Sequence, residues 1–182
     1  DTLKGGAGSD ILIGGKGSDS LQGEGDADTY LIEKQWAKLA IDLPPTQTDT
    51  ISDNDGGNTL DLSAISKDLE FVFAQAGGST KLTVSVALTG GLSNKVIIDQ
   101  AGAGTDSWIL TSGSGDDVAI IKNDVAFAGS LDAGEGENTL DYYNGTDAAK
   151  GYKSSVTVDL ETGTAAGFTS VDNFQNVFGS FS

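Results

Sequence analysis

The sequence predicts an all-β fold, made of parallel β-roll (β-solenoid) segments with an interposed antiparallel strand layer. One basis is a nine-residue repeat over residues 1–31, a period typical of solenoids. A second is a set of three segments within 69–99 in which apolar and polar residues alternate, as they do in half-buried strands. A third is the return of the repeat, in a less regular form, within 112–182.

The opening repeat is regular enough to fix its own register. After DTLK it reads GGAGSDILI, GGKGSDSLQ and GEGDADTYL. An acidic residue recurs every nine places and a large apolar residue follows it by two; these are Asp1, Asp10, Asp19 and Asp28, with Leu3, Leu12, Leu21 and Tyr30. Because side chains alternate between the two faces of a strand, we expect the apolar residues to stack as a thin core.

The residue types of this repeat indicate a site for a hard cation. Glycines tolerate positive φ and let the backbone curl with its carbonyl oxygens pointing inward. Calcium takes about six to eight oxygen ligands at roughly 2.3–2.6 Å, from carbonyls and carboxylates. A flexible Gly/Ser/Asp linker is the alternative, but a linker needs no apolar residue at every ninth place. A phosphate loop is excluded, because GGKGS has Gly17 where Ser or Thr should follow the lysine.

These motifs resemble the RTX family of secreted bacterial proteins, in which two nonapeptides form one coil. The family binds calcium through carbonyls of the first four loop positions and the carboxylate of the sixth. The resemblance implies that loop 5–10 faces loop 23–28, and that loop 14–19 faces the unit ending at Asp1. It implies the calcium ligands Asp1, Gly5, Gly6, Ala7, Gly8, Asp10, Gly14, Gly15, Lys16, Gly17, Asp19, Gly23, Gly25, Asp26 and Asp28.

The third loop departs from that pattern, since Glu24 and Asp26 stand where the second and fourth positions are glycine. We expect this to alter the backbone and add charge. A weaker site is expected where the register returns at TDTISDNDGGNTLDL, with Asp49 and Asn58 at the acidic position. Its candidate ligands are Asp53, Asp55 and Asn58, and an ordinary surface turn is the alternative.

Composition supports bound cations and argues against several other functions. The chain has 27 acidic residues against ten lysines and no arginine, a net charge of −17. This argues against nucleic acid or anionic membrane as a partner. Self-repulsion disfavours the compact state until counter-charge arrives, so several Ca²⁺ ions are expected to act on folding. No apolar run approaches the roughly 18 residues of a membrane span.

The absent residue types limit the chemistry further. Without Cys the chain has neither disulfides nor a thiolate metal site, and without His it lacks the usual general base. Only a carboxylate pair could then carry acid/base work, and the acids stand at ligand or turn positions. We therefore predict no catalytic residue and no enzyme activity in this segment.

The middle of the chain, after the first roll, predicts a cap and three strands. EKQWAKLA is a short helical segment closed by Pro44-Pro45, expected to cover the open end of the roll through Trp36 and Leu39. A surface ligand-binding role is the alternative for Trp36. Strands are expected to turn at Gly77-Gly78 and Gly90-Gly91. Their inward residues should be Leu69, Phe71, Phe73, Leu82, Val84, Val86, Leu88, Val96 and Ile98.

The last part of the chain resembles the repeats and terminal coils of large RTX proteins. SGSGDDVAI places Asp117 in the ligand position, and AGEGENTLD places Asn138 there. Their 21-residue separation is not a multiple of nine, so the coil between them should be irregular. A strand is expected at Val156, Val158 and Leu160, and apolar contacts from Val171, Phe174, Val177 and Phe178. The chain is expected to continue into another repeat.

We therefore expect three regions. They are a calcium-binding roll at 1–32, a segment of cap, partial repeat and antiparallel strands at 33–111, and an irregular second roll at 112–182. The resemblance implies a calcium-dependent folding and structural module of a larger secreted or cell-surface protein, such as an adhesin, toxin or S-layer protein, exported by type I secretion.

Two other functions remain open at this point. One is self-association or calcium-dependent binding of cell-surface glycans, with stacking by Trp36, Trp108, Tyr142, Tyr143 or Tyr152. The other is the non-catalytic roll of a secreted hydrolase or epimerase.

Overall fold

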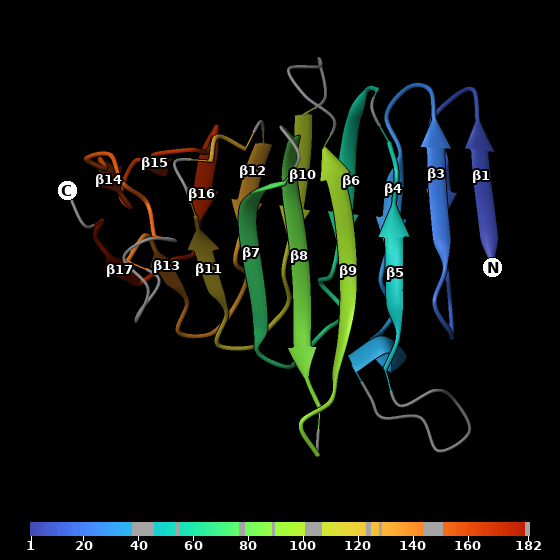
Figure 1. The fold of residues 1–182 in the computed structure, drawn as a ribbon, viewed down its shortest axis with the longest axis horizontal. Coiled ribbons are helices and arrows are strands. Elements are labelled where there is room, and N and C mark those ends of the chain that lie inside the picture. Colours follow the sequence, from blue (N-terminus) through green and yellow to red (C-terminus); the bar gives the residue numbers. More distant parts are fainter. Residues whose placement is uncertain are drawn as a thin grey trace.

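Two large β-sheets face each other along the length of the molecule (Figure 1). The structure is a computed structural model and describes residues 1–37, 46–53, 55–76, 79–88, 90–100, 107–122, 125–127, 129–143 and 151–180. The nine-stranded long sheet has the order β1 (Thr2–Gly6), β3 (Ser20–Glu24), β5 (Thr48–Ile51), β9 (Ser93–Gln100), β8 (Ser79–Ala87), β7 (Leu69–Ala76), β11 (Val118–Ile121), β13 (Thr139–Asp141) and β17 (Asn176–Phe178).

The second, six-stranded sheet is called the short sheet. Its order is β16 (Ser170–Asp172), β12 (Gly129–Asp132), β10 (Ser107–Thr111), β6 (Gly57–Asp61), β4 (Thr29–Leu31) and β2 (Ile11–Leu12). A small antiparallel pair, β14 (Val158–Asp159) and β15 (Thr164–Ala165), lies near the C-terminal end. The predicted all-β class is confirmed.

The N-terminal repeats form coils of eighteen residues, as the period predicts. The chain alternates between the sheets, so that β1 and β3 pair in parallel in one sheet and β2 and β4 in the other. Leu3 lies beside Leu21 in the long sheet and Leu12 beside Tyr30 in the short sheet, so the apolar positions of successive repeats form two stacks, one on each sheet. Leu21 and Tyr30 are completely buried.

The three expected antiparallel strands lie within the long sheet, edge to edge with its parallel strands. β7, β8 and β9 form a meander, yet β9 pairs in parallel with β5, and β7 pairs in parallel with β11. In the described part of the long sheet, β8 is therefore the strand that runs antiparallel to both of its neighbours. All nine predicted inward residues are buried. Gly90 and Gly91, with φ of 82° and 76°, shape one turn; Gly77 and Gly78 lie outside the described residues.

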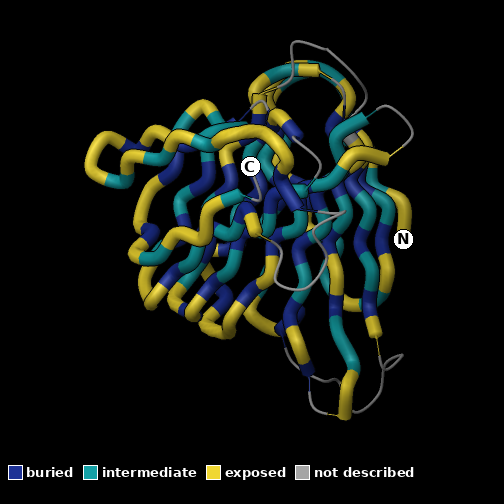
Figure 2. The backbone as a smooth tube through the Cα atoms, turned by 60° about the vertical axis from the view of Figure 1, so that its left-hand side comes forward, coloured by how far each residue is buried: buried dark blue, intermediate teal, exposed yellow. Residues whose placement is uncertain are grey.

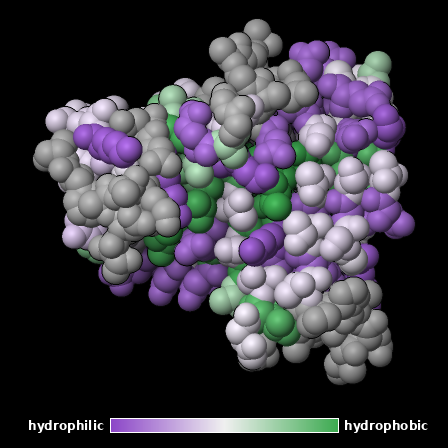
Figure 3. All heavy atoms as spheres, viewed as in Figure 1, coloured by the Kyte–Doolittle hydropathy of each residue, from purple (hydrophilic) through white to green (hydrophobic). Residues whose placement is uncertain are grey.

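One hydrophobic core passes through all three predicted regions. Buried residues recur along the strands of both sheets from end to end, and exposed ones gather mainly at the turns (Figure 2). The outer face in Figure 3 is largely hydrophilic, with scattered apolar side chains. In the C-terminal half Phe73 contacts both Phe127 and Phe168, each with ring centroids 5.0 Å apart. The division at 32/33 and 111/112 stays a prediction.

The segment that was expected to cap the first roll lies beside β9 instead. A short 3₁₀ helix, η1 (Lys34–Ala37), buries Trp36, as predicted. Its Trp36 carbonyl, however, accepts a hydrogen bond of 2.5 Å from the side-chain amide of Asn94, at the start of β9. Because β5 and β6 pair directly with β3 and β4, the roll has no open end there, and the expected capping position is wrong. Leu39 lies outside the described residues.

The C-terminal coils match the expectation in part. Asp117 and Asn138 lie at the same level of neighbouring coils, so the 21-residue segment between them closes one irregular coil. Val171 and Phe174 are buried as predicted, whereas Val177 and Phe178 are 38% and 56% exposed. Val177 and Phe178 lie on β17, the edge strand of the long sheet, so the apolar contacts expected of them do not bury them. Val158 starts β14, which is only two residues long.

Candidate metal sites

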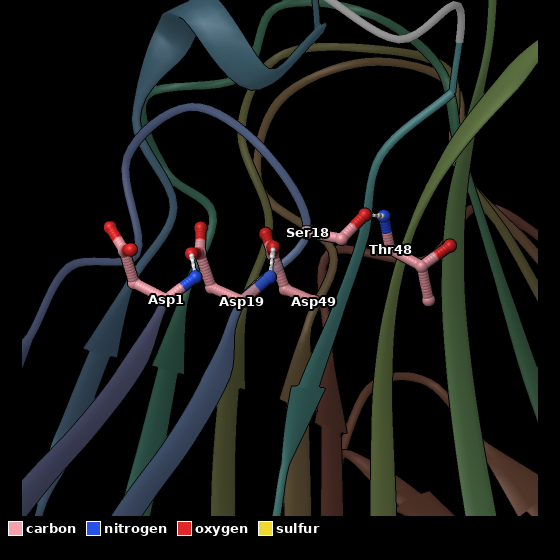
Figure 4. A network of polar contacts seen from close by, with 5 residues as sticks. All are labelled: Asp1, Ser18, Asp19, Thr48 and Asp49. Atoms are coloured by element: carbon pink, nitrogen blue, oxygen red, sulfur yellow. Dashed lines mark hydrogen bonds and ion pairs between the residues drawn. The ribbon is translucent and has the colours of Figure 1, made fainter.

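Aspartates at the strand starts form ladders that run from coil to coil. In each ladder, one side-chain oxygen accepts a hydrogen bond from the nitrogen of the aspartate at the same position in the preceding coil. Along the long sheet, Asp19 Oδ1 accepts from the terminal ammonium group of Asp1 (2.6 Å), which makes an ion pair, and Asp49 Oδ1 accepts from the backbone nitrogen of Asp19 (3.0 Å), as Figure 4 shows. Along the short sheet, Asp28 Oδ1 accepts from Asp10 (2.8 Å), and the Asn58 oxygen accepts from Asp28 (2.9 Å).

The second carboxylate oxygen has a different environment. The Oδ2 atoms of Asp10, Asp19 and Asp28 are buried and lack a hydrogen-bond partner. Burial of a carboxylate oxygen without a partner is unfavourable. Coils in register also repeat about every 4.8 Å, so like charges on neighbouring coils repel one another. Burial raises the pKa of Asp28, and the carboxylates of Asp53, Asp10 and Asp26 raise it further. Three carboxylates thus have an oxygen that is available to a positively charged group.

The first glycine of each loop makes room for that oxygen. A Cβ on Gly5 would lie 2.6 Å from Asp10 Oδ2 and 2.8 Å from the carbonyl oxygen of Gly23, and one on Gly14 would lie 2.9 Å from Asp19 Oδ2. These distances leave no space for a side chain. The Asp10 carboxylate and the Gly23 carbonyl therefore converge on one point, and both are hard oxygen donors of the kind calcium prefers.

The loop pairing implied for the first repeats is present. Gly25 donates to the Gly6 carbonyl (3.0 Å), and Gly8 donates to Asp26 Oδ2 (3.1 Å), so loops 5–10 and 23–28 face each other. Glu24 and Asp26 adopt φ of 77° and 73°, the left-handed region in which Gly6 and Gly8 also lie. The expected change of backbone is therefore wrong. Each non-glycine residue there costs roughly 1–2 kcal/mol.

Loop 14–19 lies between two neighbours. Its Asp19 accepts from Asp1 on one side, as the implied pairing requires. On the other side, the Ser18 hydroxyl accepts from the Thr48 nitrogen (2.9 Å), which brings the unit ending at Asp49 against it (Figure 4). Gly15 and Gly17 take positive φ, at 82° and 111°. The side chains of Ala7 and Lys16 are exposed, which leaves only their backbone to face an ion.

The partial repeat contributes one buried carboxylate. Asp53 is 2% exposed, and its Oδ2 accepts the hydroxyl hydrogen of Tyr30. Burial and the Asp53 hydrogen bond raise the pKa of Tyr30, so this hydroxyl stays protonated. The Asn58 side-chain nitrogen donates to the carbonyl of Asp55 (2.9 Å), and the Asp55 carboxylate accepts from Gly56 in an exposed turn. A calcium role of Asp55 and Asn58 stays a prediction.

The C-terminal ladder continues the pattern with different partners. Asp117 Oδ1 accepts from the Leu69 nitrogen (2.7 Å), and its Oδ2 accepts from the Ser112 hydroxyl. The Asn138 oxygen accepts from Asp117 (2.8 Å), while its nitrogen donates to the carbonyls of Ala133 (3.2 Å) and Asn173 (2.9 Å). Protein groups therefore satisfy both side chains. A calcium role of Asp117 stays a prediction.

Two residues that take part in these contacts, Asp49 and Tyr30, were not predicted from the sequence. Asp49 occupies the acidic position nine residues before Asn58 but was not included among the candidate ligands; it is 2% exposed, and burial raises its pKa to about 6. The nine-residue spacing was the available signal. The Tyr30 hydroxyl was missed because the repeat marks its position only as apolar. Among the described residues, no three Asp or Glu side chains converge on one point, so any metal site here needs backbone oxygens.

Comparison with known families identifies the N-terminal repeat. Residues 1–30 match the family model of the RTX calcium-binding nonapeptide repeat, in four copies. The N-terminal roll is an RTX repeat. The RTX repeat is a structural unit that binds calcium and is typically non-catalytic, so the roll is a calcium-binding structural module. No curated protein and no solved structure matched the chain. In the parts of the chain that the structure describes, no helix is long and apolar enough to cross a membrane.

Proposed function

We propose that the chain is a calcium-dependent folding and structural module of a secreted or cell-surface RTX protein, such as an adhesin, toxin or S-layer protein, and that it is exported by type I secretion. The observation that carries this proposal is the set of three buried, unpartnered oxygens, Asp10 Oδ2, Asp19 Oδ2 and Asp28 Oδ2. In this proposal each carboxylate uses one oxygen for the coil-to-coil ladder and the other for an ion between facing loops.

The consequence of this arrangement is that coil stacking and ion binding depend on each other. The ladder brings like charges together in a chain that already carries a charge of −17. Extracellular modules bind calcium at about 10⁻⁴–10⁻³ M, far above free cytosolic levels. The roll would therefore remain loose inside the cell and close outside. Each site filled at ten times its dissociation constant adds roughly 1.4 kcal/mol.

Self-association remains a candidate, whereas glycan stacking gains no support from the aromatic residues. Trp36, Trp108 and Tyr142 are at most 2% exposed, and Tyr152 is 9% exposed, which leaves Tyr143 as the exposed member of the five. These rings pack within the core; Tyr142 and Tyr152, for example, meet edge to face at 5.3 Å. We propose no catalytic role for the segment.

A calcium titration from chelator, followed by far-UV circular dichroism and light scattering, tests the proposal. The expected result is a cooperative gain of β signal near millimolar calcium that magnesium does not reproduce. A rise in scattering at the same point would support self-association. A chain that is fully folded in chelator, with no change on adding calcium, would contradict a folding role.

The double variant Asp10→Ala, Asp19→Ala sharpens this test. It removes two of the three unpartnered oxygens together with one ladder hydrogen bond, so the calcium midpoint should rise at least tenfold. Glu161→Ala, which removes an exposed acid far from the repeats, is the matched control and should leave the midpoint within twofold. An unchanged midpoint in the double variant would refute the assigned register.

A further inference from the structure

Asp55 and Gly56, which lie directly before β6, form the one Asp-Gly pair in the sequence. In such a pair the backbone nitrogen of the glycine can attack the side-chain carboxyl carbon of the aspartate. Glycine has no Cβ to hinder this approach, so the nitrogen is more accessible than in any other aspartyl bond. Asp55 is exposed, so water reaches its carboxyl group. Sequence and exposure together mark this bond as a candidate site of chemical modification.

The structure places the two reacting groups side by side but not in line. The Gly56 nitrogen donates a hydrogen bond of 2.9 Å to Asp55 Oδ1, so it lies beside the carboxyl group that it would attack. Reaction needs atoms roughly 3–3.5 Å apart and a suitable direction of approach. An amide nitrogen forms a new bond perpendicular to its own plane. Here its N–H bond, which lies in that plane, points at the carboxyl oxygen, so the approach to the carbon is unsuitable.

The other backbone polar groups of the pair also have partners. The Asp55 nitrogen donates to Asp53 Oδ1 (3.3 Å), and the Asp55 carbonyl accepts from the Asn58 side chain (2.9 Å). The Gly56 carbonyl accepts from the nitrogen of Ser107, at the start of β10 (3.3 Å). Rotation of the pair into a reactive geometry therefore requires these contacts to open, which is a local unfolding event.

The folded loop also leaves no room for the product, in which the backbone contains one additional carbon atom and the two Cα atoms lie further apart than their usual spacing. Gly56, at a φ of 85°, packs so closely on the Asp26 carbonyl that a Cβ there would overlap it. A displaced Asp55 carbonyl would lose Asn58, whose side-chain oxygen accepts from the Asp28 nitrogen (2.9 Å) and joins neighbouring coils. The fold therefore opposes both the reaction and its product.

We infer that Asp55–Gly56 is a site at which the chain converts spontaneously to isoaspartate, and that folding of this coil suppresses the conversion. In the first step the Gly56 nitrogen bonds to Asp55 Cγ, and the carboxyl hydroxyl leaves with the amide proton as water, which closes a five-membered succinimide. Water then opens one of the two ring carbonyls. One opening restores aspartate; the other leaves the backbone passing through Cβ and Cγ, with the original mass.

Peptide mapping after long incubation measures the conversion, because isoaspartyl and aspartyl peptides separate by chromatography and differ in electron-transfer fragmentation. Samples are kept in calcium, in chelator and in urea. Conversion at Asp55 should be at least tenfold faster in urea than in calcium. Asp26–Ala27, an exposed aspartyl bond with a Cβ on the next residue, is the internal control and should convert at least tenfold more slowly in urea. Asn144–Gly145, outside the described residues, is distinguished because its deamidation changes the mass.

The calcium dependence of this inference rests on the proposed function, and the chelator sample separates the two. A rate in chelator close to that in urea is expected for a coil that needs calcium to fold. A rate in chelator as low as that in calcium would contradict the proposed function and leave the modification site standing. Conversion at Asp55 that is as fast in calcium as in urea, or that does not occur in urea, would overturn the inference.

Two variants at the same position, both measured in urea so that neither needs to fold, check the chemistry. Asp55→Glu keeps the charge but requires a six-membered ring, which closes more slowly, so conversion should fall at least tenfold. Asp55→Asn forms the same succinimide with loss of ammonia, a better leaving group than water here, and should react at least tenfold faster than the parent. Equal rates in the parent and Asp55→Glu would place the reaction at another bond and overturn the inference.

Discussion

The N-terminal and C-terminal ladders share a backbone pattern but differ in the partner of the second polar atom. In both, an Asp or Asn oxygen accepts from the backbone of the neighbouring coil. In the N-terminal roll, the other atom is a buried carboxylate oxygen without a partner. In the C-terminal coils, it is the Asn138 amide nitrogen, which donates to two carbonyls, or the Asp117 oxygen, which accepts a hydroxyl hydrogen.

This difference indicates that the loops of one fold can be stabilised in two ways. A loop whose carbonyls face inward needs a positively polarised group at its centre. In the proposed function calcium would supply it in the N-terminal loops that end at Asp10, Asp19 and Asp28, whereas an amide N–H supplies it at Asn58 and Asn138 and a hydroxyl at Asp117. Asn58, whose nitrogen donates to the Asp55 carbonyl, follows the second arrangement inside the first half of the molecule. Calcium dependence should therefore fall from the N-terminal to the C-terminal coils.

Removal of calcium should give the largest effect and should separate the two regions. If each of the three proposed sites is filled at ten times its dissociation constant, calcium would stabilise the N-terminal coils by ~4 kcal/mol. Hydrogen exchange followed by mass spectrometry should therefore show amides of residues 10–31 exchanging at least a hundredfold faster in chelator. Amides of residues 129–141 should change less than tenfold. Equal acceleration along the chain would show that the two regions unfold together and would break the comparison.

The strict period made the N-terminal roll predictable. A nine-residue spacing without exception leaves one register, and the observed neighbours Leu3 and Leu21 follow from it. The inward faces of β7, β8 and β9 were equally predictable, because alternation identifies the buried side of a strand. Alternation does not say which strands are neighbours. The placement of β9 beside β5, and of β7 beside β11, depends on packing between distant segments.

The candidate site residues were predicted from the same period. Asp49 also fits that period, nine residues before Asn58, but its contact with Asp19 spans thirty residues, and no fixed spacing marks that distance. η1 lies beside β9 because Asn94 binds the Trp36 carbonyl, a contact without a sequence signature. Asn58 was expected to contribute to a weaker site, and Asn138 was placed at the ligand position of its loop. Their nitrogens donate hydrogen bonds to nearby carbonyls, a property of Asn that the sequence alone already contains.

Asn138→Asp should convert a C-terminal loop to the N-terminal type. The change buries a charge and leaves the carbonyls of Ala133 and Asn173 without their donor. Loss of a buried donor and addition of an unpaired charge should lower the free energy of unfolding by ~3 kcal/mol in chelator. Calcium should restore part of this loss, as measured by urea unfolding with and without the ion. A loss that calcium does not reduce would show that this loop cannot accept a cation.

The smallest expected effect concerns pH. Burial raises the pKa of Asp117 from its ordinary 3.8 to about 6, although its bonds to Ser112 and Leu69 oppose the shift. Between these values the folded state binds more protons than the unfolded state, so the free energy of unfolding falls as pH rises from about 4 to 6. Protonation at low pH therefore stabilises this coil, and ionisation above about pH 6 removes that contribution.

Asp117→Asn isolates this term, because an amide keeps the acceptor for Leu69 and a partner for Ser112 without the charge. In chelator, the variant should be more stable than the parent by about 1–2 kcal/mol at pH 7 and similar to it at pH 4. Urea unfolding at both pH values measures the difference. A larger gain in the free energy of unfolding at pH 4 than at pH 7 would contradict a raised pKa of Asp117. A stability loss at pH 7 that calcium abolishes in the parent alone would instead place Asp117 among the calcium ligands, and the boundary between the two kinds of loop would move past β11.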